Sequence, residues 1–369
     1  MSTEVASAND KPFNVLCLDG GGMRGLYTAT LLDVLTQRMS LSLDGRPGDL
    51  GSAFGLICGT STGAILASAL AVGVPLSQVQ AFYAERGPKV FTQPYPKKAG
   101  WWKSLRWLVR HINRPAANAA ELKAALNSIF GDTTLGQVYA NRGIGLCIPA
   151  VYASNLKTVV FKTPHVPHYN RDKGYKLVDV CLASGAAPIQ LPLHKFPQAP
   201  GQDKDETFID GGLWANSPVL VGLVEALTLA PGRPIRILSV GTCDEPSGDP
   251  SVLADQNWGI SRWKGGMGIL EASLSAQAVG HLHITKLLIK ALNDKGHDIR
   301  LLRLKEAPKA ADYYSAIGLD RADERALTTL RTLAHSDVNE ITSDLRRGGD
   351  PDLQFAADIL SAIKPLEKE

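Results

Sequence analysis

The sequence predicts an α/β protein in which helices cover a buried, mostly parallel sheet. Two observations carry this prediction. Short runs such as 13–18 (FNVLCL) are almost wholly apolar, which is typical of strands that are buried on both faces of a parallel sheet. These runs alternate with segments of helical spacing such as 26–39, and glycine-containing turns join the two kinds of segment.

The alternation can be followed along the chain. The expected strands are 13–18, 52–59, 144–153, 206–210 and 235–242, and the expected helices are 26–39, 63–73, 176–187 and 218–230. The last third is mainly helical, with long patterns at 268–292 and 324–345 around a short strand at 299–304, and we expect it to pack on the same sheet. The predicted organisation is a disordered tail (1–12), a main domain (13–245) with an irregular insertion (88–118), and a helical C-terminal part (246–369).

The composition is that of an ordinary globular protein. The 369 residues are 44% hydrophobic and 20% charged, and the formal net charge of +3 is too small for a general nucleic-acid binder. The five cysteines lie in apolar runs without CxxC spacing, so we expect neither disulfides nor a zinc site. No signal peptide is visible, and the longest apolar stretch, 64–74, is shorter than the roughly 20 residues that span a bilayer. We expect a cytoplasmic protein that needs no metal or cofactor.

The segment GTSTG is the first candidate for chemistry. Gly59, Ser61 and Gly63 have the GxSxG spacing between an expected strand and an expected helix, which is the context of a nucleophile elbow. A serine on such a turn is strained, and flanking glycines allow the strand and the helix to pack closely. The alternative is a loop in which a hydroxyl group from residues 60–62 merely caps the helix.

A glycine-rich turn follows the first expected strand. The segment GGGMRG, from Gly20 to Gly25, has the GxGxxG spacing of a dinucleotide-binding turn, but neither Asp33 nor Asp44 ends a second strand, as ribose recognition requires. The other interpretation is that its backbone N–H groups stabilise an oxyanion at a helix N-terminus. Arg24 in the first helical turn opposes the helix dipole, so an anion nearby would explain its position.

A serine nucleophile also needs a base. None of the eight histidines ends a strand before a short turn, whereas Asp210 ends the strand 206–210 and precedes two glycines and a helix. This position predicts a carboxylate at the carboxyl ends of parallel strands, where open α/β sheets bind ligands. The alternative is an aspartate that only opens a Gly-Gly turn. Burial would raise its pKa enough to accept a proton from Ser61 while the glycine turn stabilises the developing charge.

Together these motifs resemble those of the patatin-like phospholipases. DGGGMRG (19–25), GTSTG (59–63) and DGG (210–212) occur in that family's order and spacing. LASGAAPIQLPL (182–193) resembles the segment that precedes the family's catalytic aspartate. The resemblance spans residues 13 to about 245.

The resemblance implies a three-layer α/β/α fold and hydrolysis of acyl esters of membrane phospholipids through a Ser–Asp dyad and an acyl-enzyme. Carried over by residue, it assigns the nucleophile to Ser61, the base to Asp210, the main oxyanion donors to Gly21 and Gly22, and supporting roles to Gly20 and Arg24. The remaining motif glycines are Gly25, Gly59, Gly63, Gly211 and Gly212. The chain also resembles bacterial patatin-like effectors of antiphage defence that cyclic oligonucleotides activate.

Residues 97–114 (KKAGWWKSLRWLVRHINR) are basic and rich in tryptophan, with no acidic residue. If this segment is helical, its apolar face and cations suit an anionic bilayer surface, and the enzyme would visit the inner face of the membrane. The alternatives are tryptophans packed on the core, cations that bind a phosphate-bearing regulator, or a lid. The residues expected at this contact are Trp101, Trp102, Lys103, Arg106, Trp107 and Arg110.

Overall fold

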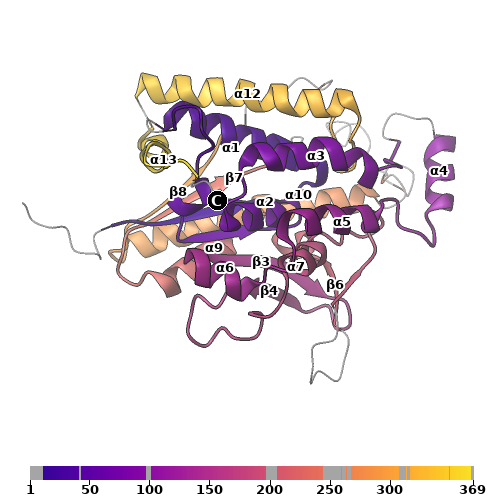
Figure 1. The fold of residues 1–369 in the computed structure, drawn as a ribbon, viewed down its shortest axis with the longest axis horizontal. Helices are drawn as coiled ribbons and strands as arrows, with labels where there is room; N and C mark the ends of the chain where they lie inside the picture. Colours follow the sequence, from indigo (N-terminus) through magenta and orange to yellow (C-terminus); the bar gives the residue numbers. More distant parts are fainter. Residues whose placement is uncertain are drawn as a thin grey trace, which may run out of the picture.

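The structure is a computed structural model of the chain (Figure 1). It describes residues 11–40, 43–96, 101–196, 206–243, 259, 263, 267–306, 313, 316–348 and 350–366, without the side chains of residues 101, 104, 108 and 267. Most of the predicted tail, residues 1–10, lies outside this description.

In the described part of the chain, eight strands form one sheet in the order β5-β6-β3-β2-β1-β7-β8, and β4 pairs with β3. The strands are β1 (Phe13–Leu18), β2 (Leu56–Gly59), β3 (Gly145–Tyr152), β4 (Thr158–Lys162), β5 (His194–Lys195), β6 (Thr207–Asp210), β7 (Ile235–Val240) and β8 (Ile299–Arg303). The five strands from β3 to β8 in this order are parallel, and β4, β5 and β6 add antiparallel pairs at the β3 side.

The strand β3 brings two other strands together. One side of β3 pairs with β4 along residues 147–151, so its other neighbours share the opposite side. There β2 pairs in parallel with residues 145–147 and β6 pairs antiparallel with residues 150–152. The strands β2 and β6 therefore run toward each other, and their carboxyl ends lie next to each other along β3.

Helices cover both faces of the sheet. The helices are α1 (Gly25–Met39), α2 (Thr62–Val72), α3 (Leu76–Val90), α4 (Trp101–Arg110), α5 (Ala119–Phe130), α6 (Leu135–Arg142), α7 (Leu177–Ser184), α8 (Gly212–Ala215), α9 (Val219–Leu229), α10 (Met267–Asn293), α12 (Glu324–Arg347) and α13 (Pro351–Ser361), with 3-10 turns η1 (Gly22–Arg24) and η2 (Leu50–Ala53). One apolar core lies between the sheet and the layer that contains α1, α2, α3 and α12, and a second lies under α9 and α10. The helix α12 packs along α1, and α4 projects from the body (Figure 1).

These layers confirm the predicted three-layer α/β/α fold with a mostly parallel sheet. One detail was wrong, because the strand 206–210 was expected to be parallel and β6 is antiparallel to β3. A strand's own residues do not determine its direction, which depends on the path of the connection before it. Of the helices in the described residues, none has both the length and the apolar character needed to cross a bilayer.

Candidate active site

The turn between β2 and α2 holds Ser61 in a strained conformation. Its φ of 55° and ψ of −117° lie outside the regions that non-glycine residues favour. The flanking glycines are needed for packing, because a Cβ at Gly59 would collide with the Gly63 carbonyl oxygen, and one at Gly63 would collide with the Leu18 carbonyl oxygen. The serine is thus forced into the position that the GxSxG spacing predicts.

The side chain of Ser61 faces an aspartate instead of capping the helix. It makes no capping hydrogen bond to α2, and its Oγ donates to Asp210 Oδ2 at 2.9 Å. The Ser61 N–H donates to Ser184 Oγ at 2.9 Å, and that hydroxyl donates to the Pro149 carbonyl at 2.7 Å. Ser184, the last residue of α7, therefore links the turn to β3. The sequence analysis did not predict this role, although the residue lies in the LASGAAP segment.

Asp210 reaches Ser61 because β6 ends against the end of β2. Its Oδ1 accepts from the Gly212 N–H at 2.6 Å, which leaves Oδ2 for the serine. The following glycine is sterically required, since a Cβ at Gly211 would collide with the Pro149 carbonyl oxygen. Each carboxylate oxygen thus has a defined partner.

Burial changes the acidity of Asp210. Only 6% of the residue is exposed, and this desolvation raises the pKa of its carboxyl to about 6. The hydrogen bonds from the Gly212 N–H and the Ser61 hydroxyl favour the charged form and limit the rise. A carboxylate with such a pKa is a stronger base than an exposed aspartate and is still ionised at neutral pH.

The glycine turn after β1 approaches its neighbours closely. The Gly20 N–H donates to the Asn216 carbonyl at 2.9 Å, so this group is already used. A Cβ at Gly21 would collide with Thr242 Oγ1, and one at Gly22 (φ 56°) would collide with the carbonyl oxygen of Leu319. In the described part of the chain, the N–H groups of Gly21 and Gly22 donate no hydrogen bond, which leaves them for a ligand.

Arg24 acts on the same turn through the backbone. Its Nε and its backbone N–H both donate to the Gly21 carbonyl, at 3.4 and 3.1 Å. Because the C=O and the N–H of one trans peptide point in opposite directions, holding this carbonyl orients the N–H of Gly22. Gly25 begins α1, where a Cβ would collide with the Thr62 hydroxyl, so the turn and the Ser61 helix pack directly together.

An ion pair between Arg303 and the buried Asp19 stabilises the start of the glycine turn. Arg303 Nη1, at the end of β8, donates to Asp19 Oδ2 at 2.6 Å, and Asp19 is 1% exposed. Asp19 is the first residue of the DGGGMRG motif, but its partner lies in the helical C-terminal part and could not be found from spacing. The C-terminal part therefore contributes directly to the site's support.

The basic, tryptophan-rich segment is divided by the structure. Trp107 is buried, stacks edge-on against Tyr95 and donates from Nε1 to the Gln93 carbonyl at 3.0 Å. Trp102, Lys103, Arg106 and Arg110 are exposed, whereas the side chain of Trp101 and residues 97–100 lie outside the described residues. Trp107 thus anchors α4, and the rest of its described surface faces solvent.

Three side chains that could bind a metal ion come from β3, from the loop after β4 and from α9. Cys147, His165 and Glu225 are buried, and one ligand atom of each lies within 4.8 Å of the others. Glu225 also forms an ion pair with Lys162 and a hydrogen bond with His165 Nε2, the latter at 3.0 Å. These contacts already satisfy the carboxylate, and the cluster does not touch the Ser61 turn, so we assign it no part in the chemistry.

The fold and this geometry define a class of protein: an α/β enzyme with a serine on a strand-to-helix turn, bonded to a buried aspartate beside a glycine-rich turn. A family model described as patatin-like phospholipase matches residues 16–223. A cGAMP-activated phospholipase of Pseudomonas aeruginosa is 34% identical over 79% of this chain and 82% of that protein, and one of Escherichia coli is 31% identical over 88% of each. Patatin-like protein 1 of rice (Oryza sativa subsp. indica) is 29% identical over 81% of this chain and 76% of that protein.

The chain therefore belongs to the patatin-like phospholipase family. This membership makes it a lipid acyl hydrolase and confirms the resemblance seen in the three motifs. It argues against the alternative in which GGGMRG is a dinucleotide-binding turn and a hydroxyl group from residues 60–62 merely caps the helix.

Proposed function

We propose that the protein hydrolyses acyl esters of membrane phospholipids with Ser61 as nucleophile and Asp210 as general base. The hydrogen bond of 2.9 Å from Ser61 Oγ to Asp210 Oδ2 carries this proposal. As Ser61 Oγ bonds to the ester carbonyl carbon, its proton moves to Asp210. When the tetrahedral intermediate collapses, the C–O bond to the lysolipid breaks and the leaving oxygen takes that proton.

In the second half of the reaction, water takes the role that the serine hydroxyl had in the first. Asp210 accepts a proton from water, and the water oxygen attacks the acyl group on Ser61. Collapse of this intermediate breaks the acyl–serine bond, returns the proton to Ser61 and releases a fatty acid. In both halves the N–H groups of Gly21 and Gly22 stabilise the oxyanion, and Arg24 positions the peptide between them.

The substrate is a membrane lipid, and α4 is the contact that we propose for its surface. Trp102, Leu105 and Val109 recur at helical spacing on α4 and are 68%, 40% and 59% exposed. Ile112, just past the end of the helix, is 70% exposed. Exposed cations, Lys103, Arg106 and Arg110, lie along the same helix. An apolar stripe beside cations fits the interface of an anionic bilayer.

We further propose that a cyclic oligonucleotide activates the enzyme. The relatives from P. aeruginosa and E. coli are named cGAMP-activated phospholipases, and the chain matches most of the length of each. A role in antiphage defence would follow from such activation.

Substitution of the dyad tests the mechanism. Ser61→Ala and Asp210→Asn should each lower fatty-acid release from phospholipid vesicles by about a thousandfold or more, because each removes a participant in the same step. Ser128→Ala and Asp132→Asn, at exposed positions, are the matched controls and should keep wild-type activity. A fluorophosphonate probe should label the wild-type chain at Ser61. Vesicle hydrolysis at the wild-type rate by either dyad variant would refute the mechanism.

A further inference from the structure

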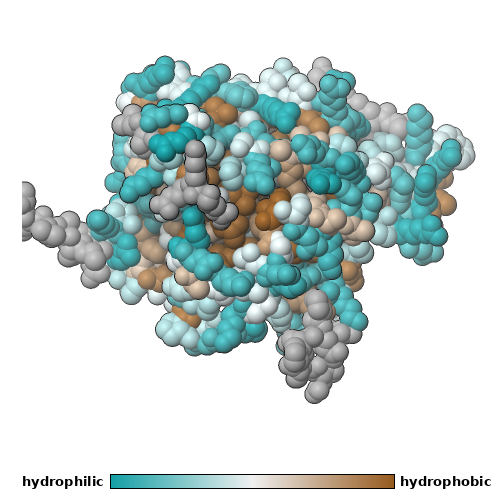
Figure 2. Space-filling view, viewed as in Figure 1, coloured by the Kyte–Doolittle hydropathy of each residue, from teal (hydrophilic) through white to brown (hydrophobic). Residues whose placement is uncertain are grey.

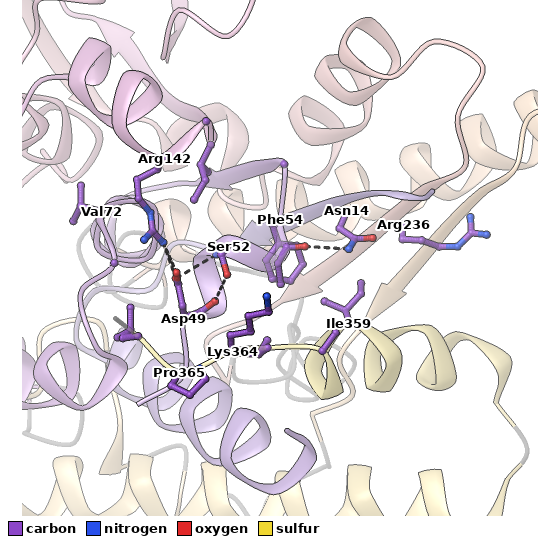
Figure 3. Close-up of a pocket in the computed structure, with 18 of the residues that line it drawn as sticks. Asn14, Asp49, Ser52, Phe54, Val72, Arg142, Arg236, Ile359, Lys364 and Pro365 are labelled. Carbon is purple, nitrogen blue, oxygen red and sulfur yellow. Dashed lines mark hydrogen bonds and ion pairs between the residues drawn. The ribbon is translucent and has the colours of Figure 1, made fainter. Parts of the chain in front are cut away.

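A large cavity lies at the end of the sheet opposite to Ser61 (Figure 3). Its volume is about 2100 Å³, and its walls include Asn14 and Arg236 near the amino ends of β1 and β7. Ser61 and the glycine turn follow the carboxyl ends of β2 and β1, and these strands are parallel to β7. The cavity is therefore separate from the dyad. Sites for small molecules usually measure about 300–1,000 Å³, so this one has room for a ligand larger than a mononucleotide.

The lining of the cavity is positively charged. Its cationic side chains are Lys11, Arg142, Arg236, Arg300 and Lys364, and its acidic ones are Asp49 and Asp358. Arg142 Nη2 pairs with Asp49 Oδ1 at 2.6 Å. Arg236 Nη2 pairs at 2.7 Å with Oδ2 of Asp298, which does not line the cavity. Within the described residues, the exposed side chains of Arg300 and Lys364 make no hydrogen bond or ion pair, although Arg300 lies close enough to the carboxylates of Asp298 and Asp352 to favour their charged forms. Two such cations favour an anionic ligand with more than one charge.

The remaining surface of the cavity is apolar. Phe54, Ile359 and Val72 contribute to the walls, and Lys364 extends its ammonium group toward Phe54 (Figure 3). In the space-filling view, the visible face is hollowed near its centre, with hydrophobic side chains at the floor and hydrophilic ones around it (Figure 2). Phosphate groups would pair with the cations while flat, weakly polar bases would lie on the floor. A nucleotide combines both features.

The helix α2 connects this cavity to the nucleophile. Ser61 is its N-cap residue, and Val72 and Gly73 at its other end line the cavity. The helix has 11 residues, which corresponds to about 16 Å. It is buried along almost its whole length, so a force on one end is transmitted as movement of a rigid body.

The segment that carries Lys364 is tied to the same region. The Lys364 carbonyl accepts from the Asp49 N–H at 2.8 Å, and the Ile363 carbonyl accepts from Ser40 Oγ at 2.8 Å. Ser40 is the C-cap of α1, whose first residue follows the glycine turn. A ligand held by Lys364 would thus act on both α2 and α1, the two helices that begin at the active site.

We infer that this cavity binds a cyclic dinucleotide activator through Arg300 and Lys364, and that α2 transmits its binding to Ser61. The inference rests on the proposed function, which supplies the ligand class, whereas the location comes from the cavity and its charges. It places the regulatory site at the amino ends of the strands and the catalytic site at the carboxyl ends.

Binding of cGAMP to the full chain, measured by calorimetry, tests the location. Arg300→Glu and Lys364→Glu should each weaken binding by about tenfold or more, and the double variant by more than either. Lys123→Glu, at an exposed position on α5 that does not line the cavity, is the matched control and should bind as the wild type does. Hydrolysis of a soluble short-chain ester without cGAMP should stay unchanged in all of these variants.

A second measurement does not depend on any variant. Hydrogen–deuterium exchange of the wild-type chain with cGAMP should show protection at 49–55, 72–75 and 359–366, and a changed rate at the start of α2. If the double variant binds cGAMP as tightly as the wild type, or if protection falls elsewhere, the site is wrong while the dyad stands. If none of cGAMP, cyclic di-AMP and cyclic di-GMP binds the wild type, both the proposed activation by a cyclic dinucleotide and this site are refuted. The loss of hydrolysis expected for Ser61→Ala does not depend on that outcome.

Discussion

The positions of Ser61 and Asp210 in the folded protein each cost stability. A non-glycine residue with the φ of Ser61 costs of the order of 1–3 kcal/mol, and the surrounding glycines and Ser184 offset that cost by close packing and a hydrogen bond. Burial of Asp210 also costs stability whenever the carboxyl is ionised. Both costs place the proposed nucleophile beside its proposed base, and such strain and burial are typical of active sites.

The pKa of Asp210 predicts how activity and stability depend on pH. If Asp210 is the base, as proposed, it works only when deprotonated, so fatty-acid release by the wild type should fall as the pH drops through about 6. Stability should change in the opposite sense. Because the pKa in the folded protein is above the ordinary value of 3.8, this group's stabilising contribution is complete below pH 3.8 and is lost as the pH rises through about 6.

Asp210→Asn removes this charge and should therefore unfold at a higher temperature than the wild type at pH 8. The expected gain is of the order of 2–3 kcal/mol, and it should shrink as the pH approaches 4. Calorimetric melts of both proteins between pH 4 and pH 8 measure the difference, with the exposed Asp132→Asn as control. A gain that does not depend on pH would contradict the assigned pKa.

At the scale of elements, the sequence pattern predicted those helices and strands whose bounds depend on their own residues. The strand β1 was predicted with its observed bounds and α2 was off by one residue at each end, because apolar runs that end at glycine specify buried elements clearly. The helices α3, α5, α6 and α13 and the strands β4 and β5 were not predicted. α3 contains Pro88, and β5 has two residues, so neither shows a regular pattern.

In the candidate active site, too, local motifs were predictable and long-range contacts were not. Ser61 and Asp210 were predicted from short motifs, whereas the contacts that orient them come from distant segments. Leu319 against the glycine turn, Ser184 behind the nucleophile and Arg303 under Asp19 depend on the folded topology. The meeting of β2 with β6 also depends on the antiparallel direction of β6, which no residue of that strand encodes.

The helix α4 allows an independent test at this scale. Val109→Glu with Ile112→Glu places one charge on the exposed apolar stripe of α4 and one on the exposed apolar residue just after it, and should lower partitioning onto anionic vesicles, and hydrolysis of their lipids, by about tenfold. Cosedimentation with vesicles measures binding, and a soluble short-chain ester reports the dyad alone. Val224→Glu introduces a charge at an apolar side chain of α9 that is 56% exposed and should leave both unchanged. Unaltered vesicle binding in the double variant would show that α4 is not the membrane contact.

At the scale of the whole molecule, the C-terminal part completes the fold that the family motifs begin. The strand β8 extends the sheet beside β7, and α12 covers α1, where Tyr27 donates to the buried Asp337 at 2.7 Å. The ion pair between Arg303 and Asp19 joins the same two halves. We therefore propose that residues 246–369 are part of a single cooperative unit and do not form a separable domain.

A truncated chain tests this unity. Residues 1–245 alone would expose the edge of β7 and the apolar face of α1, including Leu31 and Leu35, which the full chain buries. Such an edge and patch promote aggregation, so the fragment should elute as an aggregate and show no cooperative thermal transition by circular dichroism. The full chain should melt in one transition, as should a control shortened by its last three residues, 367–369. A monomeric 1–245 fragment that melts cooperatively and hydrolyses lipid would show that the motifs suffice for the fold, and that the contacts of Arg303 and α12 are accessory.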